Sequence, residues 1–164
     1  MKELPACKLD PRIKSVWRLS DAILWTIVFI CFLGVGGFIF LISDGEAGWF
    51  GPYALICFII YCIVVVLFVA VVTPVRYTRW RYQLSPEFLD IAHGIIWRRR
   101  MVVPFIRVQN TDTQQGPILR AFGLASVTVS TAAGSIAIPG LRADEAEEVR
   151  DRAAELARIA REDV

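Results

Sequence analysis

Two long runs without a charged residue constrain this chain more than any other feature. Ala22–Ile42 and Pro52–Val72 are each 21 residues long, and neither contains Asp, Glu, Lys or Arg. As an α-helix, such a run extends about 31 Å, which matches the roughly 30 Å hydrocarbon core of a bilayer. Because lipid offers no hydrogen-bond partner to a peptide group, each run is expected to be helical throughout. The sequence therefore predicts two transmembrane α-helices, at about 22–42 and 52–72.

Basic residues are distributed unequally around the two spans. The link of residues 43–51 carries Asp44 and Glu46 but no Lys or Arg, whereas both flanks are basic. The flanking residues are Lys2, Lys8, Arg12, Lys14 and Arg18 before the first span, and Arg76, Arg79 and Arg81 after the second. Short segments rich in Lys and Arg stay in the cytoplasm. We therefore expect a multi-pass protein of the inner (cell) membrane, with a hairpin at 19–75 and both termini cytoplasmic.

The rest of the chain divides into a basic cytoplasmic segment, residues 1–18, and a cytoplasmic domain of about ninety residues, 76–164. Pro74 is expected to end the second helix. Alternation of apolar and polar residues then predicts several antiparallel strands. Their expected ranges are 78–84, 88–93, 95–97, 101–105, 125–131 and a last strand through Ile136 and Ile138 that ends at Pro139, and a polar stretch begins at Val108. Arg98, Arg99 and Arg100 are expected to interrupt the third of these.

A different pattern closes the chain. Between Asp144 and Arg161, apolar residues recur at intervals of three and four, which is typical of an amphipathic helix. They are Ala146, Val149, Ala153, Leu156 and Ala160. Acidic residues crowd the first turns and arginines the last, as the helix dipole favours. A helix of this kind can cover one end of an antiparallel sheet.

Composition excludes several classes of function. With 18 basic and 16 acidic residues, the chain is not a polycation, so no nucleic-acid partner is expected. Cys7, Cys31, Cys57 and Cys62 have no C-x-x-C spacing, and only one His exists, so no metal or cofactor is expected. The lone His93 adjoins Gly94. The carboxylates of Glu87, Asp90 and Asp112 are not predicted to converge with it, and we expect no enzyme and no catalytic residue.

A transporter subunit is a further alternative. Asp21 lies at the edge of the first span, and an intramembrane acid can mark an ion path. No other ionisable Asp, Glu, Lys, Arg or His lies in either run to relay a proton or ion. Two apolar spans alone provide no polar path through a bilayer.

Several motifs of the second half are shared with a known family. Residues 82–94 form a strand-turn-strand opening that ends in glycine, and Pro104, Arg107 and Gln109 follow as proline-x-x-arginine-x-glutamine. The central motif comprises Gln115, Gly116, Pro117, Arg120, Phe122, Gly123 and Leu124, and a hairpin motif comprises Thr131, Ala132 and Gly134. The chain resembles the YdbS-like bacterial membrane proteins with a PH-like domain. It departs from their pattern at Ala133, where glycine is usual.

This resemblance implies a mainly-β, PH-like, partly closed antiparallel barrel capped by the C-terminal helix, with no catalytic residues and no established ligand. Residues 108–115 are then expected to be a strand, followed by a turn at Gly116–Pro117 and a short helical segment, 118–122. The motif residues are expected to be structural. Arg120 is expected to brace the turn by bonding to carbonyls or to an acid, since amide-rich turns commonly satisfy backbone groups.

Two hypotheses remain for what the domain binds. The first is anionic lipid, through Arg76, Arg79 and Arg81 beside the second span and through Arg98, Arg99 and Arg100, with a solvated hairpin tip as the alternative for the latter three. The second is assembly with other membrane proteins or with itself, through a groove or sheet edge. The resemblance favours an accessory or scaffold component that contacts the bilayer and has no known small-molecule substrate.

Overall fold

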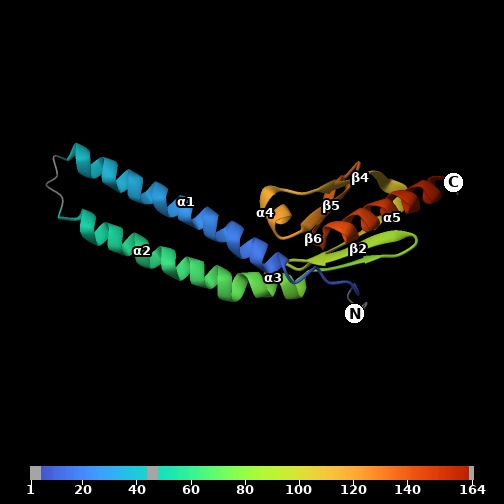
Figure 1. Ribbon diagram of the computed structural model, residues 1–164, viewed down its shortest axis with the longest axis horizontal. Coiled ribbons are helices and arrows are strands. Elements are labelled where there is room, and N and C mark those ends of the chain that lie inside the picture. Colours follow the sequence, from blue (N-terminus) through green and yellow to red (C-terminus); the bar gives the residue numbers. More distant parts are fainter. Residues whose placement is uncertain (1–4, 44–47, 163–164) are drawn as a thin grey trace. The chain divides into compact units, whose positions relative to one another are not determined.

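The computed structural model describes residues 5–43 and 48–162, so Asp44 and Glu46 of the link lie outside the described residues. The elements follow one another along the chain as coloured in Figure 1. They form two compact units. Trp17–Pro74 is the helical unit, and the described residues up to Val16 together with those from Val75 onward are the sheet unit.

The helical unit contains α1, Ile13–Ile42, from Trp17 onward and all of α2, Phe50–Leu67, and the two helices contact each other in antiparallel order. The rings of Phe29 and Tyr61 stack with centroids 4.8 Å apart, and the hydroxyl of Tyr53 donates to the carbonyl of Phe32 at 2.6 Å. The helical segments Ile13–Ile42 and Phe50–Arg79 are each long and apolar enough to cross a bilayer, and few of the side chains in their most apolar windows are buried. The helical character of both predicted spans is confirmed.

The helix does not end at Pro74, and that prediction is wrong. A π-helical turn, η1, occupies Phe68–Val72, and α3 continues through Thr73–Arg79. Proline cannot donate to the carbonyl four residues earlier, and its ring crowds that carbonyl. The wider turn directly before it relieves this crowding, so the helix continues. Consequently Thr78 and Arg79 are helical, and the first strand begins at Arg81 rather than at Thr78.

The first sheet has three antiparallel strands in the order β1-β2-β3, with β1 at Arg81–Leu84, β2 at Phe88–His93 and β3 at Arg99–Pro104. The prediction of β2 is confirmed. The strand predicted at 95–97 is wrong, because those residues form the loop after Gly94. Arg99 and Arg100 also do not interrupt a strand. They begin β3, an edge strand whose exposed side accommodates long charged side chains.

The second sheet has the order β4-β5-β6, with β4 at Val108–Gln114, β5 at Leu124–Thr131 and β6 at Gly134–Arg142. A 3-10 turn, η2, at Phe105–Arg107 precedes β4, and α4 at Pro117–Ala121 joins β4 to β5. The strand and short helix predicted around Gly116 are thus confirmed. The last strand passes Pro139 and ends at Arg142, because Gly140 adopts a left-handed φ of 66° that lets the strand bend and continue.

The C-terminal helix α5, Ala143–Glu162, lies against η2 and all three strands of the second sheet. Ala146, Ala153 and Leu156 of the predicted stripe are buried, together with Ala157. The hydroxyl of Tyr82 on β1 donates to Glu145 Oε1 at 2.9 Å and so links the first sheet to this helix. The architecture is therefore two three-stranded antiparallel sheets with one C-terminal helix, as in a PH-like fold, but the two sheets do not pair into a closed barrel.

The N-terminal segment belongs to the sheet unit. Cys7 and Tyr82 exchange backbone hydrogen bonds of 3.0 and 3.1 Å, so the segment extends the first sheet beside β1. The amide of Asp10 donates to the carbonyl of Gly140 at 3.1 Å, and Leu9 and Ile13 are fully buried. Residues far apart in the sequence thus complete one core.

Candidate functional site

The most exposed apolar side chains of the described sheet unit lie in the loop between β2 and β3. The exposed fractions of Ile96 and Trp97 are 84% and 81%. Side chains this large are rarely left so open without a partner, and an aromatic ring at a loop tip is suited to contact another surface. The loop is therefore the first candidate for a binding surface.

Gly94 fixes the shape of this loop. Its φ is 118°, and a Cβ at this position would lie 1.9 Å from the carbonyl oxygen of Trp97. Only glycine therefore allows the chain to leave β2 and return so tightly. The guanidinium of Arg79 donates to the carbonyl of Ile95 and holds the loop from the side of α3.

A hollow rich in arginine lies beside the loop on the first sheet. The strand register places Arg81, Ala92 and Arg100 in one row across β1, β2 and β3, so the three side chains share a face. Ala92, the smallest of them, leaves a depression between its two neighbours. The cavity volume is about 270 Å³, and we call it the basic hollow. It is lined by Thr78, Arg79, Arg81, Ala92, His93, Gly94, Arg98, Arg99 and Arg100.

Asp90 is the acidic partner at this site. It is only 4% exposed, and both of its carboxylate oxygens accept hydrogen bonds from Arg100, from Nε at 3.1 Å and from Nη2 at 2.5 Å. This forked pairing fixes the guanidinium plane and raises the pKa of Arg100 above its ordinary value. Since the pair is neutral as a unit, the positive charge of the hollow comes from the other arginines.

A second hollow of about 440 Å³ adjoins the first and shares His93, Gly94 and Arg99 with it. Its remaining lining residues are Arg76, Trp80, Ile95, Ile96 and Trp97. The His93 ring stacks on Trp80 with centroids 5.5 Å apart. Partial burial, and then the charges of Arg99 and Arg76, lower the pKa of His93 below its usual 6.5. The imidazole is therefore neutral at pH 7, and the cations here are guanidinium groups.

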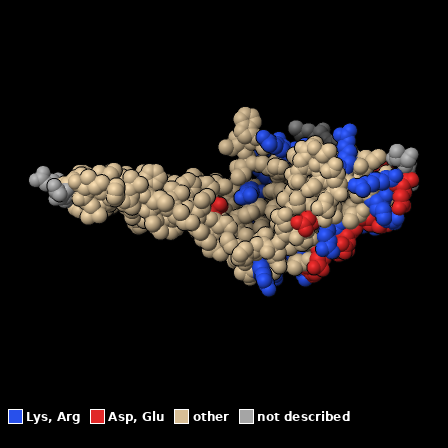
Figure 2. All heavy atoms as spheres, turned by 90° about the horizontal axis from the view of Figure 1, so that it is seen from above, with Lys and Arg blue, Asp and Glu red and all other residues tan. Residues whose placement is uncertain are grey.

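The structure brings together the two arginine clusters that the sequence presents separately. Arg79, Arg81, Arg98, Arg99 and Arg100 line the basic hollow, and Arg76 lines its neighbour. Sequence reasoning missed Ala92 as a floor, Asp90 as the partner of Arg100, and the exposed pair Ile96 and Trp97. Of these features, only the exposed pair could have been recognised in the sequence, as an aliphatic and an aromatic residue between a glycine and three arginines. Figure 2 shows that the charged side chains gather on the sheet unit, whereas the helical unit is nearly devoid of them.

The family-motif residues contribute mainly to turns. Gln115 Nε2 donates to the carbonyl of Leu124 at 2.9 Å, as expected for an amide that satisfies the backbone. Thr131 Oγ1 donates to the carbonyl of Gly134, which has a φ of 135°. The others lie at helix α4, where Gly116 caps the N-terminus, Pro117 is the first helical residue, Phe122 caps the C-terminus and Gly123 follows with a φ of 67°.

The expected role of Arg120 is wrong. Its side chain is exposed and makes no hydrogen bond or ion pair with any residue that the structure describes. The turn is instead held by backbone bonds, from the Arg120 amide to Gly116 and from the Gly123 amide to Arg120. Gln109 also lies away from the turn, in an open groove between β4 and α5.

Residues suited to metal binding do not converge in the described part of the chain. No group of three or more His, Cys, Asp or Glu side chains is close enough to hold a metal ion among residues 5–43 and 48–162. The carboxylate of Asp90 on β2 is engaged by Arg100. The arginines and the exposed apolar side chains of the arrangement are suited to bind anions and apolar surfaces.

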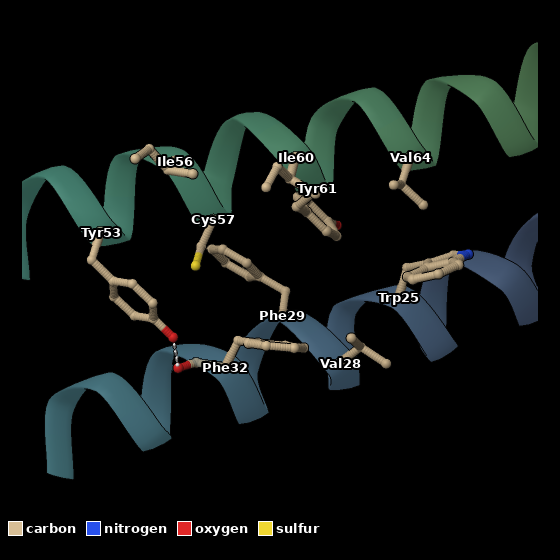
Figure 3. A pocket seen from close by; sticks show the side chains of 10 residues that line it. All are labelled: Trp25, Val28, Phe29, Phe32, Tyr53, Ile56, Cys57, Ile60, Tyr61 and Val64. Carbon is tan, nitrogen blue, oxygen red and sulfur yellow. Dashed lines mark hydrogen bonds between the residues drawn. The ribbon is translucent and has the colours of Figure 1, made fainter. Parts of the chain in front are cut away.

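A separate apolar cavity of about 340 Å³ lies between α1 and α2 (Figure 3). Trp25 and Val64 lie at one end of it and Tyr53 at the other, with Phe29, Cys57 and Tyr61 between them. The hydroxyl of Tyr53 donates to the carbonyl of Phe32, and the surface that lines the cavity is almost entirely apolar. This space is suited to hydrocarbon.

Comparison with known proteins identifies the family. The model of the family described as Bacterial PH domain matches residues 28–157. The chain belongs to the bacterial PH domain family. It is also 32% identical, over the full length of both chains, to the UPF0699 transmembrane protein YdbS of Bacillus subtilis (strain 168). No solved structure gives a significant match. The family match begins within the first predicted span and covers the second span and both sheets. The protein is therefore a YdbS-like membrane protein with a PH-like domain.

Proposed function

We propose that this protein is a non-catalytic, membrane-anchored interaction module that docks its PH-like unit on the anionic inner leaflet. The observation that carries the proposal is the exposure of Ile96 and Trp97 directly beside the arginines of the basic hollow. Tryptophan is favoured at the membrane–water interface, and each basic residue near an anionic leaflet contributes about 1 kcal/mol. The loop combines both contributions at one surface.

The covalent connection strengthens such a contact. The sheet unit resumes at Val75, directly after the second span, so the loop never diffuses away from the bilayer. A short tether provides an effective concentration in the millimolar range, and contacts that are weak for a free domain are then sufficient. Since the attraction between exposed charges is screened over about 8 Å at physiological ionic strength, docking should weaken in high salt.

A second candidate is assembly with another membrane protein through the edge of the first sheet. Strand β3 has one unpaired edge among the described strands, and near it Val102 and Ile106 are 53% and 47% exposed. A partner strand could add to that edge. This would make the protein a scaffold or accessory component, with lipid contact confined to its spans.

Hydrogen–deuterium exchange of the full-length protein in nanodiscs tests the proposal. We expect the amides of residues 94–100 to exchange more slowly in phosphatidylglycerol-containing discs than in pure phosphatidylcholine discs. The variants Ile96→Ser/Trp97→Ser and Arg98→Gln/Arg99→Gln should each lose this protection. The control Arg120→Gln/Arg152→Gln removes two charges from exposed sites elsewhere and should keep it. Full-length protein is essential, because an isolated 76–164 fragment lacks the buried Leu9 and Ile13.

Equal exchange of residues 94–100 in both kinds of disc would refute leaflet docking. Protection of β3 instead, appearing only when a membrane protein co-purifies, would favour assembly through the sheet edge. Protection that persists unchanged in 0.5 M salt would also contradict an electrostatic contact with the leaflet.

A further inference from the structure

We propose that the apolar cavity between α1 and α2 is a binding site for one acyl chain of a membrane lipid. The cavity lies in the helical unit, so this inference goes beyond the proposed function and does not depend on leaflet docking by the sheet unit. Its lining residues on α1 lie between Trp25 and Phe32, and those on α2 between Tyr53 and Val64 (Figure 3). All of them fall within the two predicted spans, so the lipid chains of the hydrocarbon core surround the site.

Contacts between the two helices hold the cavity at both ends. At one end, the ring of Trp25 meets the ring of Phe68 edge-on, with centroids 5.4 Å apart. At the other end, the hydroxyl of Tyr53 donates to the carbonyl of Phe32 at 2.6 Å, and a Cβ on Gly36 would lie 2.2 Å from the Tyr53 ring. The helices therefore cannot shift to close the cavity without losing these contacts.

The chemistry of the lining favours hydrocarbon over water. The hydroxyls of Tyr61 and Thr26 share a hydrogen bond of 3.1 Å, and the hydroxyl of Tyr53 is bonded to Phe32, so both lining tyrosines are satisfied. A buried water needs several polar partners, which an almost entirely apolar lining does not supply. An empty space of about 340 Å³ would leave the lining atoms without dispersion contacts, and such contacts hold helices together in a bilayer. A chain from the surrounding lipid restores them.

The shape of the cavity fits one extended chain. From Tyr53 to Val64, α2 rises about 16 Å, close to the roughly 15 Å that one leaflet contributes to the hydrocarbon core. The cavity follows the two helices and is partly open to its surroundings, so a lipid chain can enter from the side. A helix from a second copy is about 10 Å across with its side chains, and it does not fit between two helices that already touch.

The test is whether a lipid chain stays in the cavity of the purified full-length protein. The protein is reconstituted with phosphatidylcholine that carries a photoreactive diazirine in one acyl chain. It is then purified in a steroid-based detergent, which has no linear chain to compete, and illuminated. We expect cross-links, mapped by mass spectrometry, at lining residues such as Val28 and Ile60, and not at the exposed Ile30 and Ile63. Equal cross-linking of lining and exposed residues would overturn the proposal, because the lipid would then be bound all around the helices.

Variants that fill the cavity should expel the chain. Cys57→Phe should lower the cross-linking yield roughly fivefold or more, because a ring and a chain cannot share one close-packed space. The matched control is Cys31→Phe, the same change at an exposed cysteine of α1 outside the cavity, and it should keep the yield. Cys57→Ala leaves the space open and should keep it as well. Val28→Phe fills the cavity from the other helix and should act as Cys57→Phe does.

Several results would overturn the proposal. Equal yields in Cys57→Phe and the original protein would do so, and so would a lack of cross-links in the purified original protein. A dimer that Cys57→Phe dissociates and Cys31→Phe preserves, without retained lipid, would assign the cavity to a second copy instead. Ile96→Ser/Trp97→Ser should retain the chain, so failure of leaflet docking would leave this site unaffected.

Discussion

At the scale of single residues, the environment of His93 is the most informative. Its ring lies on Trp80, is partly withdrawn from water, and faces Arg99 and Arg76. All three influences oppose a positive charge on the imidazole. The histidine is therefore a neutral packing residue at pH 7, and acid should disturb the loop that follows it.

Protonation of His93 should make the sheet unit less stable in mild acid. Because the folded-state pKa lies below the unfolded value of about 6.5, the unfolded chain binds more protons between these two values. The contribution of neutral His93 to the free energy of unfolding is fully present above pH 6.5. It is lost as the pH falls through the pKa of His93 in the folded protein. We expect the melting temperature of the full-length protein in detergent to fall between pH 7.5 and 5, and to fall less in His93→Gln. An equal fall in both proteins would show that His93 is not the titrating group.

At the scale of elements, the docking of the N-terminal segment matters most. The segment pairs with β1 at Tyr82 and bonds to β6 at Gly140, so it links both sheets. Gly140 permits this, because its left-handed backbone bends β6 and its missing side chain leaves room for Ile13. Gly140 therefore both bends β6 and lets the N-terminal segment pack against it.

Gly140→Ala should destabilise the sheet unit by about 2 kcal/mol, through backbone strain and the displacement of Ile13. A Cβ there would lie 2.5 Å from Ile13 Cγ1. Gly123→Ala is the matched control, because Gly123 has nearly the same φ, 67°, and nothing within 4 Å of an added Cβ. Chemical denaturation of both variants in detergent should show the larger loss for Gly140→Ala. Equal losses would mean that strain alone acts and that Ile13 moves aside freely.

At the scale of the whole molecule, the distribution of charge should decide the orientation in the membrane. The segments before and after the spans are basic and the link between them is acidic. The proposed docking on the inner leaflet requires the sheet unit, with residues from both ends of the chain, to lie in the cytoplasm. If the sheet unit lay outside the cell, the proposed docking on the inner leaflet would therefore be wrong as well.

Fusion reporters measure this orientation directly. We expect a fluorescent protein fused after Val164 to fold and fluoresce, and alkaline phosphatase at the same point to be inactive, because both would be cytoplasmic. Alkaline phosphatase inserted in the link 43–51 should be active. An active phosphatase at the C-terminus would place the sheet unit outside the cell and exclude docking on the inner leaflet.

Local patterns in the sequence were sufficient for the spans, β2, β5 and α5, whereas β4 was expected from the family resemblance. A long uncharged run, a strict alternation or a stripe at intervals of three and four each reports burial within a single element. The family resemblance extended this to the PH-like fold. Local patterns failed at Pro74, at residues 95–97 and at the side chain of Arg120. There, a widened helical turn, a glycine-shaped loop and backbone bonds decided the outcome.

The site itself was decided by tertiary structure. The sequence by itself determined two membrane helices, a small sheet-and-helix unit and two groups of arginines. Only the strand register placed Arg81 and Arg100 on either side of Ala92, and only the turn at Gly94 exposed Trp97 beside them. The physical reason is that hydropathy and periodicity record which face of an element is buried, whereas a site depends on which residues from different strands share a face.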